Sequence, residues 1–225
     1  MRKRKLLLCL IALICAAVFI FSACANGSEI DATSGSSATG GTTESAGTVG
    51  TTESGENIAP PEQKSRILIA YFSCTGNTKA VAEKIASLTG GEIYEIVPAE
   101  PYTSSDINYS DSNCRANREM NDPDARPQIG SAEIDFSEYD TVIIGYPIWW
   151  GTMPKIINTF IDKYDLSGKN ILPFCTSGGS GITRSVSEIR TAEPAATVRD
   201  GLRATGAGDA NLEKWLCDGG AIEIK

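Results

Sequence analysis

An apolar run, followed by a polar loop and a helix-like segment, constrains this chain more than any other stretch. The run Ile67–Phe72 is continuous and ends at turn residues, which is typical of a strand buried on both faces of a parallel sheet. The loop Ser73–Thr78 then carries hydroxyl and amide side chains around one glycine. Over Thr78–Leu88, apolar residues recur at helical spacing. The chain therefore places a polar loop between a buried strand and the start of a helix.

Such a loop is typical of an anion site. The free backbone N–H groups of the first helical turn point into the loop, and the helix dipole favours negative charge there. Hydroxyls of Ser73 and Thr78 can add hydrogen bonds, and the loop itself contains no lysine or arginine. This donor set favours a phosphate monoester, and neither G-x-x-x-x-G-K-[ST] nor G-x-G-x-x-G follows the strand. The alternative is a capped helix without a ligand, because Ser, Thr and Asn are good N-caps.

Further strands and helices are expected to alternate along the rest of the chain, which specifies a parallel three-layer α/β fold. Pro173 lacks an N–H group, so the strand that contains it requires a gap in the hydrogen-bond ladder. The expected strands are Glu92–Val97, Thr141–Tyr146, Asn170–Cys175 and a short peripheral Ala195–Leu202. The expected helices are Asp111–Met120, Lys155–Lys163 and Asp209–Cys217.

Two more loops with unusual composition follow predicted strands. Right-handed crossovers place the C-terminal loops of parallel strands at one edge of the sheet, where ligands bind. In Pro147–Pro154 the adjacent Trp149 and Trp150 point different ways, so we expect at most one in the core and the other free to cover a flat ring. The alternative is that both pack the loop against the sheet.

The third loop, Thr176–Gly181, is rich in glycine. Its three glycines, Gly178, Gly179 and Gly181, let the backbone pass close to a ligand and adopt positive φ. Together the three loops predict a site for a flat ring with a phosphate tail, and flavin mononucleotide (FMN) is one such ligand.

Residues 65–203 resemble the flavodoxin family, because Ser73–Thr78 is similar to the phosphate-binding signature of that family. The segments Gly145–Gly151, Asp165–Lys169 and Thr176–Gly181 resemble a bacterial flavodoxin-like branch more closely. The resemblance implies a flavodoxin-like three-layer sandwich, a five-stranded parallel sheet of order 2-1-3-4-5, and FMN as cofactor.

Position by position, the resemblance also implies three groups of FMN contacts. The phosphate would be held by Ser73, Thr75, Gly76, Asn77 and Thr78. The isoalloxazine ring would be flanked by Pro147, Ile148, Trp149, Trp150 and Gly151. Its far side would contact Thr176, Ser177, Gly178, Gly179 and Gly181.

The N-terminal part predicts export and a lipid anchor. Four basic residues at positions 2–5 precede the apolar run Leu6–Phe21, which is typical of a secretory signal and shorter than the roughly 20 residues of a spanning helix. The segment Phe21–Cys24 resembles the bacterial lipobox, with Cys24 as the lipidated residue. Residues 1–23 are therefore interpreted as a signal peptide, which implies an extracytoplasmic protein anchored to the bacterial membrane.

Residues 24–63 are interpreted as a disordered tether, because Ala, Gly, Ser, Thr and Glu dominate and cannot bury enough apolar surface. A coil of this length reaches roughly 35 Å. The folded domain is expected over 64–225, a standard size for one domain. Residues 24–225 contain 16 basic and 28 acidic residues, and the chain has no histidine. This acidic balance argues against a nucleic-acid partner.

The segment Pro98–Glu138 is longer than a simple connection needs, and its arginines could bind an anionic substrate or pair with Asp122 and Asp124. No disulfide is expected among Cys74, Cys114, Cys175 and Cys217.

These features predict a membrane-tethered, FMN-binding oxidoreductase that passes electrons between a reduced donor and a small acceptor such as a quinone, with NAD(P)H:quinone-type activity as one form of it. The cofactor carries the chemistry, so no catalytic side chain and no metal are expected. The alternatives are a flavodoxin-type electron carrier that acts through a redox protein partner, and a flavin-free scaffold with the same fold.

Overall fold

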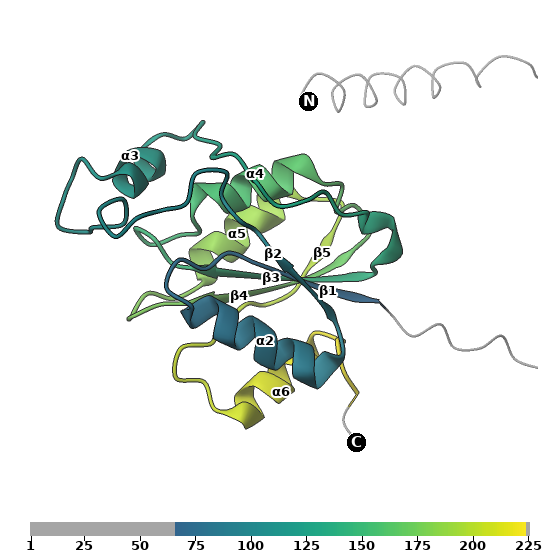
Figure 1. Ribbon diagram of the computed structural model, residues 1–225. Coiled ribbons are helices and arrows are strands. Elements are labelled where there is room, and N and C mark those ends of the chain that lie inside the picture. The colour runs from purple at the N-terminus through teal and green to yellow at the C-terminus, as the bar shows by residue number, and fades with distance from the viewer. Residues whose placement is uncertain (1–65, 224–225) are drawn as a thin grey trace, which may run out of the picture. The chain divides into compact units, whose positions relative to one another are not determined.

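The structure is a computed structural model that describes residues 66–223, in which a parallel sheet lies between two helical layers (Figure 1). The predicted signal peptide, Cys24 and the tether lie outside the described residues. The strand order is β2-β1-β3-β4-β5, with β6 pairing β4. This confirms the predicted fold class and strand order. The strands are β1 (Ile67–Tyr71), β2 (Glu92–Glu95), β3 (Thr141–Pro147), β4 (Asn170–Thr176), β5 (Thr197–Val198) and β6 (Leu202–Arg203).

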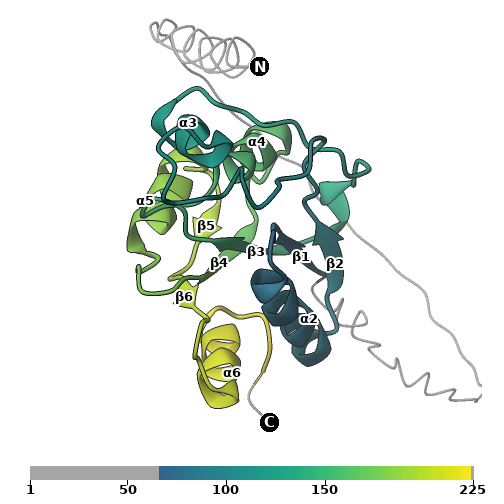
Figure 2. The same ribbon diagram turned by 60° about the vertical axis from the view of Figure 1, so that its left-hand side comes forward.

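Helices cover both faces of the sheet (Figure 2). On one face α2 (Asn77–Thr89) and α6 (Asp209–Asp218) enclose one apolar core. On the other face α4 (Lys155–Lys163) and α5 (Thr183–Ala192) enclose the second. The helix α5 was not predicted, although Ile182, Val186 and Ile189 recur at helical spacing and are buried.

The register of the central strands brings the three predicted loops to one edge. Tyr71 pairs with Gly145, and Pro147 pairs with Thr176. The N–H of Ile148 donates to the carbonyl of Thr176 at 2.9 Å. The loops after β1, β3 and β4 therefore begin side by side.

The predicted single strand Ala195–Leu202 is wrong, because the structure has two short strands with a break between them. The carbonyl of Ile171 accepts from the N–H of Arg199, and the carbonyl of Cys175 accepts from that of Ala204. Pro173 lies between these two positions. Its backbone faces the same neighbouring strand, because the N–H and C=O groups of alternate residues in a strand point to the same side. The gap that Pro173 requires is thus confirmed, and it splits the outer strand.

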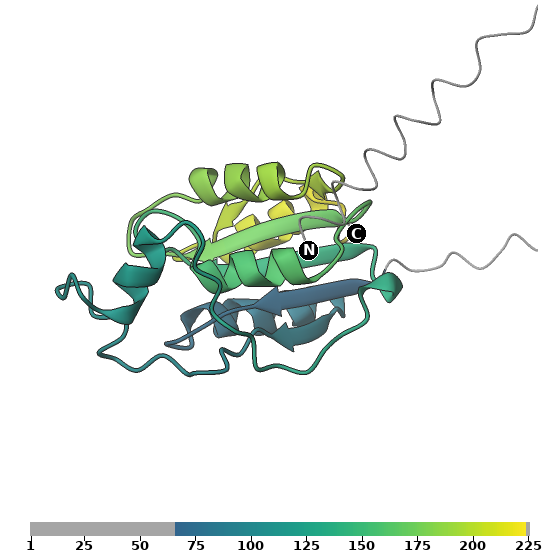
Figure 3. The same ribbon diagram turned by 90° about the horizontal axis from the view of Figure 1, so that it is seen from above.

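A long excursion over residues 98–130 follows β2 and contains α3 (Arg115–Asn121); a 3₁₀ turn, η1 (Phe136–Glu138), precedes β3. The predicted helix Asp111–Met120 thus begins four residues later than expected. The two ends of the excursion, which we call its neck, are joined by an antiparallel bridge between Pro98 and Ile129. Figure 3 shows it extending beyond the helical layer at the end of the domain where β3 and β4 finish.

The expected pairing of the arginines in this excursion with Asp122 and Asp124 is wrong. Arg115 pairs with Glu119 at 2.7 Å, one turn further along α3. Arg126 instead reaches Asp162 on α4, also at 2.7 Å. These ion pairs fasten the excursion to itself and to the helical layer.

None of the helices over residues 66–223 is both long enough and apolar enough to cross a membrane. The cysteines described, Cys74, Cys114, Cys175 and Cys217, are free thiols.

Candidate functional site

The first loop leads into α2, whose first turn has no side-chain cap. Gly76 precedes α2 in the left-handed region, with φ 83°, and no side chain caps the helix. Its carbonyl accepts from the N–H of Ala80 at 2.9 Å. Within residues 66–223, the N–H groups of Asn77, Thr78 and Lys79 have no acceptor. Three backbone donors and the positive end of the helix dipole are therefore available to an anion.

The side chains of this loop differ in their availability. Ser73 is half-buried, Thr75 and Asn77 are exposed, and the amide of Asn77 donates to the hydroxyl of Thr75 at 3.3 Å. Thr78 is buried, and its hydroxyl is 2.8 Å from that of Thr176. Thr78 thus offers its N–H to a ligand, while its hydroxyl ties the first loop to the third.

The second loop is a tight turn built on two positive φ angles. The backbones of Trp149 and Thr152 exchange both hydrogen bonds, at 2.9 and 3.1 Å. Trp150 has φ 46° and Gly151 has φ 82°, as a type I′ turn requires. Among the described residues, Trp150 is the sole non-glycine with positive φ. A bulky residue in this region carries strain, which typically accompanies a functional position.

The two tryptophans of this turn have different surroundings, as expected. Trp149 is 3% exposed and packs edge-on against Phe72, with ring centroids 5.5 Å apart. Trp150 is only half-buried. Pro147 and Ile148, also half-buried, lead into the turn. One tryptophan is therefore part of the core, and the other lies at the rim of the site.

The third loop is held at its start and open along its length. The N–H of Ser177 donates to the hydroxyl of Thr205 at 2.8 Å, and the hydroxyl of Ser177 accepts from Gly179 at 3.1 Å. No atom lies within 4 Å of a β-carbon built on Gly178, Gly179 or Gly181. Glycine permits a positive φ at these positions, but none of the three adopts it. What these glycines offer a ligand is open space beside an exposed backbone, which it can approach closely.

Sequence reasoning missed the aromatic contacts that the excursion makes with the second loop. Its Tyr102 packs against Trp149, with ring centroids 5.1 Å apart, and its Tyr109 lies 4.8 Å from Trp150. Two tyrosines spaced by seven in a long connection were the available signal.

The first loop also carries the thiol of Cys74, an exposed residue. Partial desolvation of the sulfur raises its pKa to about 11, although the charge of Arg115 opposes the shift. Within residues 66–223, no three potential metal ligands cluster.

The loops fit a ligand with a phosphate tail and a flat ring. Free N–H donors at α2 suit the phosphate, the open backbone at Gly178 and Gly179 admits a polar ring edge, and half-buried Trp150 offers an aromatic surface. The predicted residues from all three loops thus lie at one edge of the sheet.

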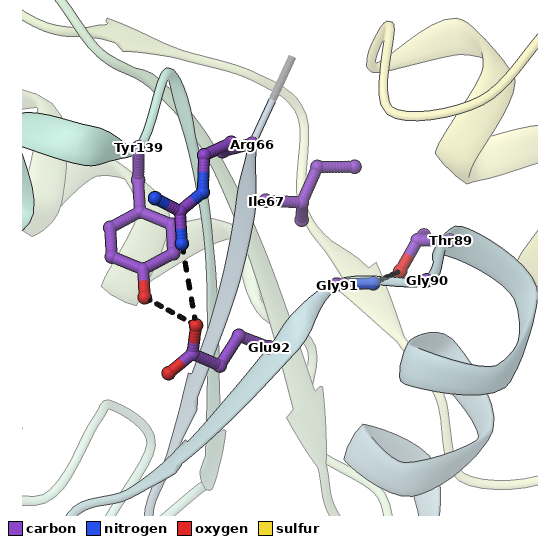
Figure 4. Close-up of a pocket in the computed structure, with 7 residues that line it drawn as sticks. All are labelled: Arg66, Ile67, Thr89, Gly90, Gly91, Glu92 and Tyr139. Atoms are coloured by element: carbon purple, nitrogen blue, oxygen red, sulfur yellow. Dashed lines mark hydrogen bonds and ion pairs between the residues drawn. The ribbon is translucent and has the colours of Figure 1, made fainter. Parts of the chain in front are cut away.

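A hollow of about 280 Å³ lies at the opposite edge, where β1 and β2 begin (Figure 4). Arg66 pairs with Glu92 at 3.7 Å and contacts the ring face of Tyr139. The hydroxyl of Tyr139 donates to Glu92 at 2.7 Å. These polar groups already pair with one another, so we do not assign the hollow a ligand.

The fold and the loops define a class of protein that binds a phosphate-tailed ring at the C-terminal edge of a doubly wound sheet. The chain belongs to the flavodoxin family, since the family model for flavodoxin matches residues 66–218. The comparison with curated proteins gave no match.

Solved structures resemble the chain over most of its described part. A candidate flavoprotein from Bacteroides eggerthii is 43% identical, covers 72% of this chain and 99% of its own, and has a TM-score of 0.66. Another, from Bacteroides uniformis, is 40% identical over 68% of this chain and 99% of its own, with a TM-score of 0.65. A Lactobacillus acidophilus flavoprotein solved in complex with FMN is 29% identical, with coverages of 67% and 98% and a TM-score of 0.56.

Proposed function

We propose that this protein is an FMN-binding oxidoreductase that transfers electrons from a reduced donor such as NAD(P)H to a small acceptor such as a quinone. FMN is the cofactor, as the flavodoxin family and the FMN complex of the Lactobacillus acidophilus relative indicate. The observation that carries the proposal is the set of free N–H donors at α2 beside Trp150 and the glycine loop.

The chain's residues position the cofactor. The N–H groups of Asn77, Thr78 and Lys79 would bind the phosphate without a metal ion. The backbone of Gly178 and Gly179 would hydrogen-bond the polar edge of the ring, and Pro147–Gly151 would flank the ring. When bound, FMN supplies reversible transfer of one or two electrons.

The remaining chemistry needs little from side chains. The net reaction removes a hydride from NAD(P)H and adds two electrons and two protons to a quinone, so one proton comes from solvent. The chain contains no histidine to relay it. Loop atoms that exclude water from one ring face and leave the other edge accessible are sufficient.

The excursion favours an enzyme over a carrier. It adds Tyr109 and Tyr102 as a wall beside Trp150 and Trp149, which narrows the approach to the ring. A small flat molecule fits such an approach better than the broad face of a protein partner.

Cofactor binding is the first test. Titration of the purified domain (residues 64–225) with FMN should quench flavin fluorescence and give a yellow protein with a structured absorbance spectrum. Absence of binding at tens of micromolar FMN would refute the proposal.

The second test separates an enzyme from a carrier. Stopped-flow reduction of the loaded protein by NADH and NADPH, with and without a soluble naphthoquinone, should give steady turnover. Reduction that occurs only through an added redox protein would instead establish a carrier.

We also propose that Cys24 is lipidated and that residues 24–63 tether the domain to the outer face of the bacterial membrane. The basic positions 2–5, the apolar run and the small residues before Cys24 support this. Full-length protein expressed in a bacterium should fractionate with membranes, and Cys24→Ala should not carry the lipid by mass spectrometry. Unlipidated wild-type protein would refute the anchor.

A further inference from the structure

The base of the excursion is rigidly attached to the domain. At its neck, Ala99 donates its N–H to Gln128 at 2.8 Å, and Gly130 donates to Val97 at 2.7 Å. Tyr102 packs edge-on against both Phe72 and Trp149, with centroids 5.8 and 5.1 Å away. The position of the excursion's tip is therefore set by the core.

A hydrogen-bonded network stiffens this base further. The Tyr102 hydroxyl donates to Glu119 at 2.5 Å, and Arg115 donates to the same carboxylate at 2.7 Å. The Arg115 guanidinium also lies 4.1 Å from the centroid of the Tyr102 ring. These side chains are largely enclosed, at 19% exposure for Arg115 and 15% for Glu119, so the network persists better than a surface ion pair.

At the tip of the excursion, Tyr109 contacts Trp150, the tryptophan with positive φ. Tyr109 is 61% exposed, yet one side of its ring contacts Trp150 at 4.8 Å with an interplanar angle of 36°. The alternative turn conformations open to Trp150 would break this contact. The contact thus favours the positive φ of Trp150 over the conformations that a bulky residue would otherwise adopt.

The same distance limits where a ring ligand can lie. A ring between two others needs centroids about 7 Å apart, twice the usual 3.5 Å of aromatic contact. The 4.8 Å between Tyr109 and Trp150 is too short. A flavin ring therefore cannot insert between Tyr109 and Trp150, and would meet the part of the half-buried indole that neither Tyr109 nor the core covers.

We propose that Tyr109 is a positioning residue for FMN, which acts by holding the indole of Trp150 in its strained turn so that the exposed part of the indole meets the isoalloxazine ring. The proposal rests on FMN binding at this site. Tyr109 does not touch the cofactor itself; it raises the fraction of molecules in which Trp150 is ready to bind, and the apparent affinity rises with that fraction.

The test compares FMN dissociation constants of Tyr109→Ala and Tyr109→Phe by flavin fluorescence. Tyr109→Ala should bind about three- to tenfold more weakly, from the usual worth of an aromatic contact, and Tyr109→Phe should bind like wild type. Ile93→Ala, which removes another exposed apolar side chain, from β2, is the control and should not change the dissociation constant.

A double variant shows whether Tyr109 acts through Trp150. If it does, adding Tyr109→Ala to Trp150→Ala leaves the dissociation constant of Trp150→Ala unchanged. Additive losses would overturn the proposal, as would tighter binding by Tyr109→Ala, which would mean that Tyr109 occupies the ring's own place.

A cofactor-free measurement separates this inference from the proposed function. Trp149 and Trp215 are buried, at 3% and 9% exposure, so acrylamide quenching of tryptophan fluorescence reports mainly on Trp150. Quenching should increase in Tyr109→Ala without FMN present; unchanged quenching would overturn the inference. If the wild-type protein binds no FMN, the proposed function is refuted. If the wild type binds FMN and Tyr109→Ala binds it equally tightly, only the role of Tyr109 is refuted.

Discussion

The two edges of the sheet differ in whether their polar groups are paired. At the edge where β1 and β2 begin, Arg66, Glu92 and Tyr139 satisfy one another around a hollow (Figure 4). At the edge where β1, β3 and β4 end, the first N–H groups of α2 have no partner in the described chain. The same helix ends at the hollow, where Gly90 donates its N–H to Ala86 at 2.8 Å and so closes the last turn.

The comparison teaches that concavity alone does not locate a binding site. The hollow is the more pronounced cavity, but a ligand there would have to break existing pairs before it made new ones. At the loop edge, by contrast, the N–H groups of Asn77, Thr78 and Lys79 have no acceptor within the described residues, so a ligand there breaks no existing pair. Unpaired polar groups held by a rigid scaffold are therefore the better indicator of function.

The largest expected effect separates the two tryptophans at the loop edge. Trp149→Ala removes a buried ring, so the free energy of unfolding should fall by about 3–5 kcal/mol in urea titrations. Trp150→Ala should cost less than about 1 kcal/mol of stability, yet weaken FMN binding about tenfold. Equal losses of stability would contradict the division between core and rim.

The next effect compares the two left-handed glycines that flank α2. Gly76→Asp places a carboxylate beside the free N–H groups, where it repels a phosphate, and FMN affinity should fall by about a hundredfold or more. Gly90→Asp introduces the same strain at φ 68° beside the hollow and serves as the control. If both variants lost FMN alike, the phosphate would not bind at the start of α2.

A smaller effect concerns the hydroxyl pair that joins the first and third loops. Thr78→Val leaves the buried hydroxyl of Thr176 without its partner and should cost about 1–2 kcal/mol of unfolding free energy. Thr176→Val should cost a similar amount, and the double variant should cost less than the sum. Strict additivity in urea titrations would show that the bond contributes nothing.

The smallest effect tests the hollow itself. Glu92→Gln weakens an exposed ion pair with Arg66, so stability should change by less than about 1 kcal/mol. FMN affinity should stay within experimental error of wild type. A clear loss of FMN affinity would reverse the assignment of the two edges.

The sequence predicted the sheet well because its strongest patterns come from burial. Ile67–Phe72 and Thr141–Tyr146 are central strands that pack on both faces, and such strands leave continuous apolar runs. The positions of the three loops follow from those strands and the rule for crossovers. The missing hydrogen bond at Pro173 was also predictable from covalent structure alone.

The remaining errors arise where tertiary contacts decide. The helix α5 begins after a glycine loop and is rich in Ser and Thr, which are weak helix formers, so the spacing of its few apolar residues was not recognised. The ion pairs of the excursion depend on which element lies nearby, as Arg126 and Asp162 illustrate, 36 positions apart. The contact of Tyr109 with Trp150 likewise follows from the closed neck of the excursion, which no local pattern reveals.

The break opposite Pro173 affects how readily two copies of the domain can pair through their sheet edges. An unbroken outer strand would offer a row of free N–H and C=O groups to a neighbouring copy of the chain. The split between β5 and β6 leaves two strands of two residues each, too short to nucleate edge-to-edge pairing. Pro173 thereby limits edge-to-edge pairing at the margin of the sheet that β5 and β6 form.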